Sequence, residues 1–104
     1  MSKKIMITGM AFTSAFLLAL STTAFAGGDA AAGEKAAGQC ASCHGANGEG
    51  VGENPKIAGM DTGAFTKAMN DYKSGARKNM MMEMFAKKLS DKDIADLAAF
   101  YATK

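Results

Sequence analysis

Residues 27–104 hold too little apolar material for a hydrophobic core of ordinary size. This stretch contains eleven glycines, five aromatic residues and no tryptophan. Domains this small usually need additional stabilisation from a disulfide, a metal or a large buried cofactor. The two cysteines of the chain are therefore the first candidates to form a disulfide, bind a metal or attach a cofactor.

The segment before residue 27 has the pattern of a secretory signal peptide. Lys3 and Lys4 form a positive start, residues 5–20 carry no charge, and Ala24-Phe25-Ala26 is a small-x-small cleavage signal. The uncharged run is shorter than the roughly 20 residues of a membrane-spanning helix, which disfavours a retained membrane anchor. We therefore expect export to the periplasm, cleavage after Ala26, and one domain over residues 27–104.

Removal of this segment changes the charge balance. The whole chain has 12 basic and 10 acidic residues. Because two lysines leave with the signal peptide, residues 27–104 are expected to be close to neutral. They also lack a basic tract interleaved with aromatic residues, so nucleic acid is excluded as a predicted partner.

Both ends of the domain predict helices. Asp29 is a suitable N-cap for an Ala-rich helix that extends to about residue 41. Near the other end, Ser90 and Asp93 approximate a capping box. The helix that follows has an apolar stripe at helical spacing, formed by Ile94, Leu97, Ala98 and Tyr101.

A further helix is predicted in the middle of the domain. It covers Gly63 to Ser74, with Asp61 or Thr62 as its cap and Gly75 at its end. No segment alternates between apolar and polar residues as a strand does. The predicted fold class is therefore all-α.

Two segments are predicted to lack regular secondary structure. The run from His44 to Gly63 contains six glycines and the only proline, Pro55. Loops of this length in compact domains are usually functional. The second irregular segment is the methionine-rich run Arg77 to Met84, which is expected to lead into a short helical turn through Lys88.

Both cysteines lie in one motif with the only histidine. The motif fits C-x-x-C-H, the attachment signature of c-type haem, and reads Cys40-Ala41-Ser42-Cys43-His44. Two thiols at this spacing at a helix end can bond to the two vinyl groups on one side of a porphyrin, and the adjacent imidazole then lies under the iron. The motif predicts one covalent haem c on Cys40 and Cys43, with His44 as an axial iron ligand.

Other uses of the two cysteines fit less well. Zinc needs three or four protein ligands, whereas the chain offers two cysteines and one histidine without a suitably spaced carboxylate. A thioredoxin-like pair is expected near a βαβ pattern, but this motif follows an Ala-rich helix. A disulfide would close a tiny loop and leave His44 unexplained.

Beyond this motif, residues 28–104 resemble the class I c-type cytochromes, in particular the small bacterial c553-type proteins and the domains of cytochrome c4. The similarity rests on six blocks in order: 28–30 (Gly-Asp-Ala), 40–45 (Cys-Ala-Ser-Cys-His-Gly), 55–59 (Pro-Lys-Ile-Ala-Gly), 72–75 (Tyr-Lys-Ser-Gly), the methionines of 80–84, and 89–101. The resemblance implies three to five helices wrapped around one covalently attached haem.

The resemblance also implies two specific contacts. The first and last helices would cross, with Gly33 and Ala37 permitting close approach of the Phe100–Tyr101 end. The carbonyl of Pro55 would accept the ring proton of His44.

The resemblance places the second iron ligand among the methionines, and a thioether opposite histidine raises the reduction potential. Similar proteins often have Arg-Lys-Asn-Pro-Met-Met, with the second methionine as ligand. Here Met80 stands where that proline would be, which indicates Met82, and a spacing of seven residues before Leu89 indicates the same residue. A register counted from Arg77-Lys78, as in some shorter relatives, gives Met81 instead.

Four other kinds of side chain are expected either in the core or near the edge of the haem. Met69 lies on an apolar helix face and is expected in the core, and the spare methionines are expected as soft filler around the haem. Tyr72, Arg77 and Lys78 are as consistent with contacts to the haem propionates as with ordinary packing and solvation.

An iron with both axial positions filled has no open site for a substrate, so we expect an electron carrier and not an enzyme. Its expected partners are redox proteins that dock transiently, such as a membrane-bound cytochrome complex, a dehydrogenase or a terminal oxidase, with no small-molecule substrate. Two alternatives stay open: a haem enzyme or gas sensor with an open sixth position, and a permanent subunit of a larger oxidoreductase.

Overall fold

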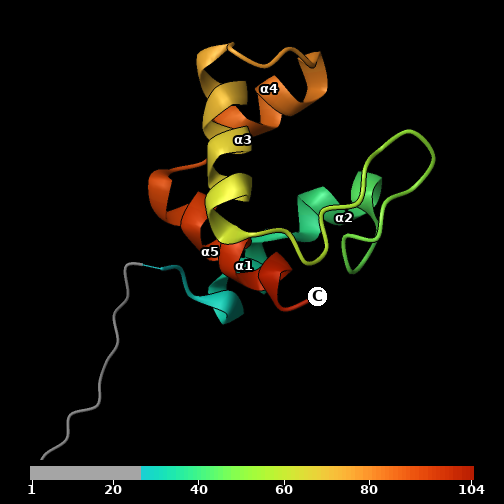
Figure 1. Ribbon diagram of the computed structural model, residues 1–104, viewed down its shortest axis with the longest axis vertical. Coiled ribbons are helices and arrows are strands. Elements are labelled where there is room, and N and C mark those ends of the chain that lie inside the picture. The colour runs from blue at the N-terminus through green and yellow to red at the C-terminus, as the bar shows by residue number, and fades with distance from the viewer. Residues whose placement is uncertain (1–26) are drawn as a thin grey trace, which may run out of the picture.

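The computed structural model describes residues 27–104, so the signal peptide predicted for residues 1–26 lies outside the described residues. The described part contains five helices, shown in Figure 1: α1 (Ala30–Ala36), α2 (Gly38–His44), α3 (Thr62–Ser74), α4 (Met80–Lys87) and α5 (Asp91–Ala102). It has no β-strand, only an isolated bridge between Val51 and Asn54. None of these helices is long and apolar enough to cross a membrane. The all-α prediction is confirmed.

Helices α1 and α5 cross (Figure 1), and their backbones come very close to each other at Gly33. A Cβ atom added to Gly33 would lie 2.0 Å from the carbonyl oxygen of Asp96 and 2.8 Å from the Cβ of Phe100. No side chain larger than hydrogen fits there unless the helices separate. The crossing implied by the family resemblance is confirmed, and Gly33 permits the close approach as expected.

The core gathers around α5. Tyr101 and Leu97 are completely buried, and the Phe65 ring of α3 stacks on Tyr101 with ring centroids 5.9 Å apart. Met69 of α3 is also buried, as predicted. The full buried apolar set is Ala37, Phe65, Met69, Ala86, Ile94, Leu97, Ala98, Phe100 and Tyr101.

Most predicted helix ends are confirmed. The Asp61 carboxylate accepts a hydrogen bond from the Ala64 N–H at 3.0 Å, and Gly75 ends α3 in the left-handed conformation, with φ of 85°. The capping box of α5 is complete, because Ser90 and Asp93 each accept from the other's backbone N–H at 3.0 Å. These caps satisfy donors that the first turn of a helix leaves free.

The first predicted helix is divided in two. The Asp29 cap is present, with its carboxylate accepting from the Ala31 N–H at 2.9 Å. However, α1 ends at Ala36, and α2 begins at Gly38. The Ala37 N–H is shared between the carbonyls of Gly33 and Glu34, at 2.9 and 3.3 Å, the tightened geometry common at helix ends. The second piece runs three residues beyond the expected end and includes His44.

The expectation of an irregular segment through Met84 is wrong, because α4 begins at Met80. Asn79 is its N-cap: the Asn79 side chain accepts from the Met82 N–H at 3.0 Å, and Glu83 accepts from the Asn79 N–H at 3.0 Å. Asparagine is among the preferred N-cap residues. This capping signal is local to the sequence, but the methionine run around it favours a loop.

The glycine-rich loop between α2 and α3 folds back on itself and on α5. The Gly48 carbonyl accepts from the N–H groups of Ile57 and Ala58 at 2.8 and 2.9 Å, and the Gly59 N–H donates to the Tyr101 carbonyl at 2.8 Å. Gly48 has φ of 75°, and a Cβ there would lie 2.7 Å from the Tyr101 ring. The loop is thereby fixed beside the end of α2.

Candidate functional site

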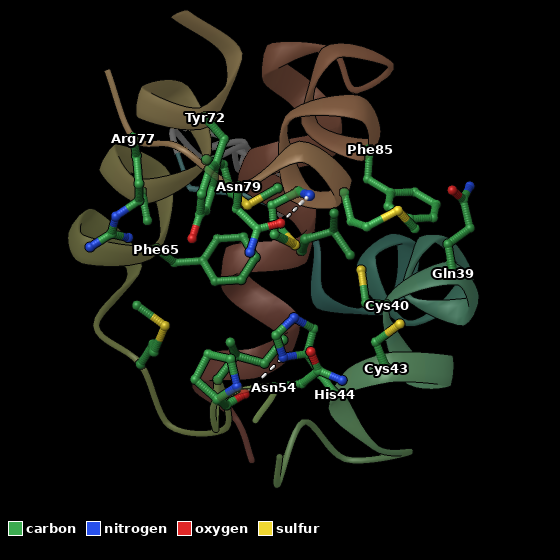
Figure 2. Close-up of a pocket in the computed structure, with 18 of the residues that line it drawn as sticks. Gln39, Cys40, Cys43, His44, Asn54, Phe65, Tyr72, Arg77, Asn79 and Phe85 are labelled. Carbon is green, nitrogen blue, oxygen red and sulfur yellow. Dashed lines mark hydrogen bonds between the residues drawn. The ribbon is translucent and has the colours of Figure 1, made fainter. Parts of the chain in front are cut away.

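A cavity of about 690 Å³ lies between α2, the glycine-rich loop, α3 and α4. Figure 2 shows it, with Cys40 and Cys43 on one side of the view and Tyr72 and Arg77 on the other. Cofactor and ligand sites commonly have volumes of roughly 300–1,000 Å³ and mostly apolar walls. Apolar side chains from several elements line this one, including Ile57, Phe65 and Leu97.

The C-terminal half of α2 brings the whole C-x-x-C-H motif to the cavity. Residues three apart on a helix share one face, so Cys40 and Cys43 are neighbours, and both are free thiols that line the cavity with His44. The helix ends directly after His44. Gly45 follows with φ of 95°, a backbone conformation that favours glycine.

The His44 ring is held in one orientation. The side chain is buried, and its Nδ1 atom lies 2.7 Å from the Pro55 carbonyl oxygen. Because a carbonyl only accepts, Nδ1 must carry the proton, which leaves the lone pair of Nε2 available for a metal. The contact with Pro55 implied by the family resemblance is confirmed.

The Cys40 thiol has the wrong electrostatics for a dithiol oxidoreductase. Burial raises the pKa of Cys40; the Tyr101 hydroxyl partly offsets this rise, and the neighbouring Cys43 adds to it. Reactive cysteines of redox enzymes have lowered pKa values, because the thiolate is the nucleophile. This supports attachment of a group at Cys40 over thiol exchange.

Both candidate axial methionines line the cavity from α4. Met82 is partly buried and packs against the core, whereas Met81 is 52% exposed. The other two methionines of this cluster, Met80 and Met84, do not line the cavity and are 82% and 46% exposed. The expectation that the spare methionines fill space around the site is therefore wrong for these two.

The rim of the cavity contains hydrogen-bond donors. Tyr72, Arg77 and Lys78 all line it, and the Arg77 guanidinium lies 5.5 Å from the centre of the Tyr72 ring. Lys56 and Asn79 also line the cavity, and sequence reasoning did not assign them to the site. Asn79 could have been found from its capping position.

Tyr101 presents a second feature that the sequence did not reveal. Its hydroxyl is fully buried and makes no well-formed hydrogen bond in the described part of the chain, although the Cys40 thiol lies beside it. Burial raises the pKa of Tyr101. The helical spacing predicted a core position but could not show that the hydroxyl also would be buried.

The residues around the cavity fit haem c. The apolar walls suit a porphyrin, the paired thiols suit its two vinyl groups, imidazole and thioether suit its iron, and the cationic rim suits its two carboxylates. Residues 27–104 contain no cluster of three His, Cys, Asp or Glu side chains that would hold another metal.

Comparison with known proteins agrees with this chemistry. Residues 30–103 match the family model described as Cytochrome c. The chain belongs to the cytochrome c family. Haem c, bound covalently and containing iron, is the cofactor of this family, and transfer of electrons is its function.

The relatives include chains of similar length and longer ones. The chain is 41% identical over 90 residues to cytochrome c-553 of Helicobacter pylori, covering 84% of this chain and 94% of that one. It is 43% identical over 88 residues to cytochrome c4 of Pseudomonas aeruginosa, covering 84% of this chain but 44% of that one. The chain thus spans less than half the length of that relative.

A solved structure has a similar fold. Cytochrome c4 of Acidithiobacillus ferrooxidans superposes with a TM-score of 0.72 at 26% identity, covering 75% of this chain and 51% of that chain. Together with the family match, this confirms the predicted cytochrome c fold.

Proposed function

We propose that this protein is a periplasmic electron carrier with one haem c, attached through Cys40 and Cys43 and ligated at the iron by His44 and Met82. The observation that carries this proposal is the cavity itself, which has both thiols and the oriented His44 ring on one wall and Met82 on another. When bound, the haem supplies an iron that alternates between Fe(II) and Fe(III) and so carries one electron.

His44 has its role fixed by its neighbour. The Pro55 carbonyl accepts the Nδ1 proton at 2.7 Å, which selects one tautomer and prevents the ring from turning. Such partners also raise the basicity of the ligating nitrogen. Pro55 therefore acts as a positioning residue for His44.

Met82 is held by the cap of its helix. Its N–H donates to the Asn79 side chain at 3.0 Å, and its side chain packs against the core. Met81 is the alternative ligand, with a more exposed side chain on the same helical turn. The rim donors Tyr72, Arg77 and Lys78 would neutralise the haem carboxylates.

The partners of this carrier are redox proteins, such as a membrane-bound cytochrome complex, a dehydrogenase or a terminal oxidase. With both axial positions supplied by the protein, the site has no place for a small-molecule substrate. Near neutrality of residues 27–104 favours weak and transient docking, over less than about 1,200 Å² of buried surface. The signal peptide pattern of residues 1–26 supports location in the periplasm.

Absorption spectroscopy of the purified protein tests this proposal. A denatured haem spectrum of the c type, with pigment that resists extraction into acidified organic solvent, is expected from the two thioether bonds. Extraction of the pigment would contradict attachment at Cys40 and Cys43. Rapid binding of carbon monoxide by the reduced protein would favour an open sixth position, and co-elution with a large partner would favour a permanent subunit.

The axial ligand is tested by two matched substitutions. Met82→Ala is expected to abolish the weak long-wavelength band of thioether-ligated ferric haem and to lower the reduction potential by on the order of 0.1 V, because the axial ligand tunes it. Met81→Ala is the control and is expected to keep the band. Loss of the band in Met81→Ala alone would assign the iron to Met81.

A further inference from the structure

Three methionines of α4 are neither part of the core nor the proposed iron ligand, although Met81 also lines the cavity. Met80, Met81 and Met84 are 82%, 52% and 46% exposed. The other methionines of the described part, Met60, Met69 and Met82, are buried or packed against the core. Exposed apolar side chains gathered on one short segment call for an explanation, and core packing does not provide one.

The three exposed side chains are neighbours on the helix surface. Met84 follows Met80 by four residues and Met81 by three, and such pairs have Cβ atoms about 5–6 Å apart. Methionine has three rotatable bonds beyond its backbone, so the sulfur atoms can converge on a common point. Met82, two residues after Met80, belongs to a different face and lines the cavity.

The chemistry of this methionine triad selects one class of metal. Thioethers are soft ligands that bind Cu(I), whereas zinc, magnesium and calcium prefer nitrogen, thiolate or oxygen ligands. We infer that Met80, Met81 and Met84 form a surface site for one Cu(I) ion with three thioether ligands. The Glu83 carboxylate lies in the same turn and adds negative charge beside the cation.

This copper site borders the proposed haem site, because Met81 also lines the cavity whereas Met80 and Met84 do not. Met81 can serve Cu(I) only if it does not bind the iron, so the inference rests on the assignment of Met82 as axial ligand. The exposed positions of Met80 and Met84 keep the site open to solvent when the cavity holds its cofactor.

Titration of the holoprotein with Cu(I) tests the site. The reduced protein, labelled with ¹³C at the methionine methyl groups, would receive Cu(I) anaerobically as its acetonitrile complex. We expect one equivalent to shift the methyl signals of Met80, Met81 and Met84 and to leave that of Met82 unchanged. Absence of a shift at one equivalent, or movement of the Met82 signal in place of the other three, would overturn the inference.

Substitutions give the matched comparison. Met80→Leu and Met84→Leu each keep an apolar side chain of similar volume but remove one sulfur, and each is expected to weaken Cu(I) binding at least about tenfold, equivalent to about 1.4 kcal/mol. Met60→Leu, outside the triad, is expected to bind Cu(I) as the unsubstituted protein does. Equal affinity in the Met80→Leu/Met84→Leu double variant would overturn the inference.

The same samples separate failure of the copper site from failure of the haem assignment. The long-wavelength band of the ferric protein reports axial ligation without copper. If this band requires Met82 and copper still does not bind, only the copper inference is wrong. If the band requires Met81, the proposed ligand set and the triad are both wrong.

Discussion

The crossing of α1 and α5 and the walls of the cavity are built in opposite ways. At the crossing, the two helix backbones come so close at Gly33 and Asp96 that no Cβ fits, and Leu97 and Tyr101 are completely buried. Around the cavity, Cys40, Ile57 and Met82 are only partly buried, and about 690 Å³ separates the walls. The first region is complete with protein atoms alone, whereas the second needs a bound group.

This difference explains how a chain with few large apolar residues can have a stable fold. The helix crossing supplies a small conventional core, and the haem supplies the rest of the apolar interior. The apolar side chains that line the cavity are removed from water only when a group fills it, and burial of apolar surface contributes about 25 cal/mol per Å².

The largest expected effect therefore comes from preventing haem attachment. In a Cys40→Ala/Cys43→Ala variant we expect the cavity walls to lose their fixed packing, because nothing replaces the missing interior. Near-ultraviolet circular dichroism and thermal unfolding of the haem-free protein measure this. A cooperative melt close to that of the holoprotein would contradict the dependence on haem.

The crossing itself can be opened with one methyl group. In Gly33→Ala the new Cβ would lie 2.0 Å from the Asp96 carbonyl oxygen, so the helices must separate, at an expected cost of about 2 kcal/mol. Gly38→Ala is the matched control, because a Cβ there meets no atom within 4 Å. It is expected to be neutral or stabilising by about 0.5–1 kcal/mol, as measured by denaturant unfolding of both holoproteins.

A smaller effect is expected at the carboxylate that anchors the start of α1. Asp96 is 5% exposed and accepts from the Asp29 N–H at 2.8 Å and from the Lys92 ammonium at 2.7 Å. Asp96→Ala leaves the Asp29 N–H without its partner, so we expect a loss of about 1–2 kcal/mol. Lys92→Ala should change stability little, because its ammonium is exposed to solvent.

The same anchor predicts a pH dependence. The Asp29 N–H, and then Lys92, hold the pKa of Asp96 below its ordinary value of 3.8. A lowered pKa in the folded state means that the stabilisation is present above pH 3.8 and is lost as the pH falls through the lower folded value. Acid unfolding of the holoprotein should show this loss, and the Asp96→Ala variant should lack that component.

The smallest effect is expected at the boundary between the two regions. The Tyr101 hydroxyl is buried without a hydrogen-bond partner within residues 27–104, so Tyr101→Phe removes an unsatisfied polar group. We expect the holoprotein to be unchanged or more stable by up to about 1 kcal/mol. If thermal unfolding instead shows that Tyr101→Phe destabilises the holoprotein by more than about 1 kcal/mol, the hydroxyl has a hydrogen-bond partner in the haem-bound protein.

Local signals in the sequence determined the start of α1, both ends of α3, the start of α5, the all-α class and the candidate attachment site. The caps at Asp29, Asp61 and Ser90 and the glycine at position 75 act within one helical turn, so they could be recognised without any tertiary information. The C-x-x-C-H motif likewise combines its reactive groups within five residues. The contact between His44 and Pro55 was implied by family resemblance and not by spacing.

Only the tertiary structure decided which side chains face the cavity and which face solvent. The methionines at 80–84 look equivalent in sequence, but packing of α4 turns Met82 toward the cavity and leaves Met80 and Met84 exposed. The break at Ala37 and the burial of the Tyr101 hydroxyl were likewise not visible in the local pattern. Burial depends on contacts between segments that are distant in the sequence, and local sequence patterns do not predict those contacts directly.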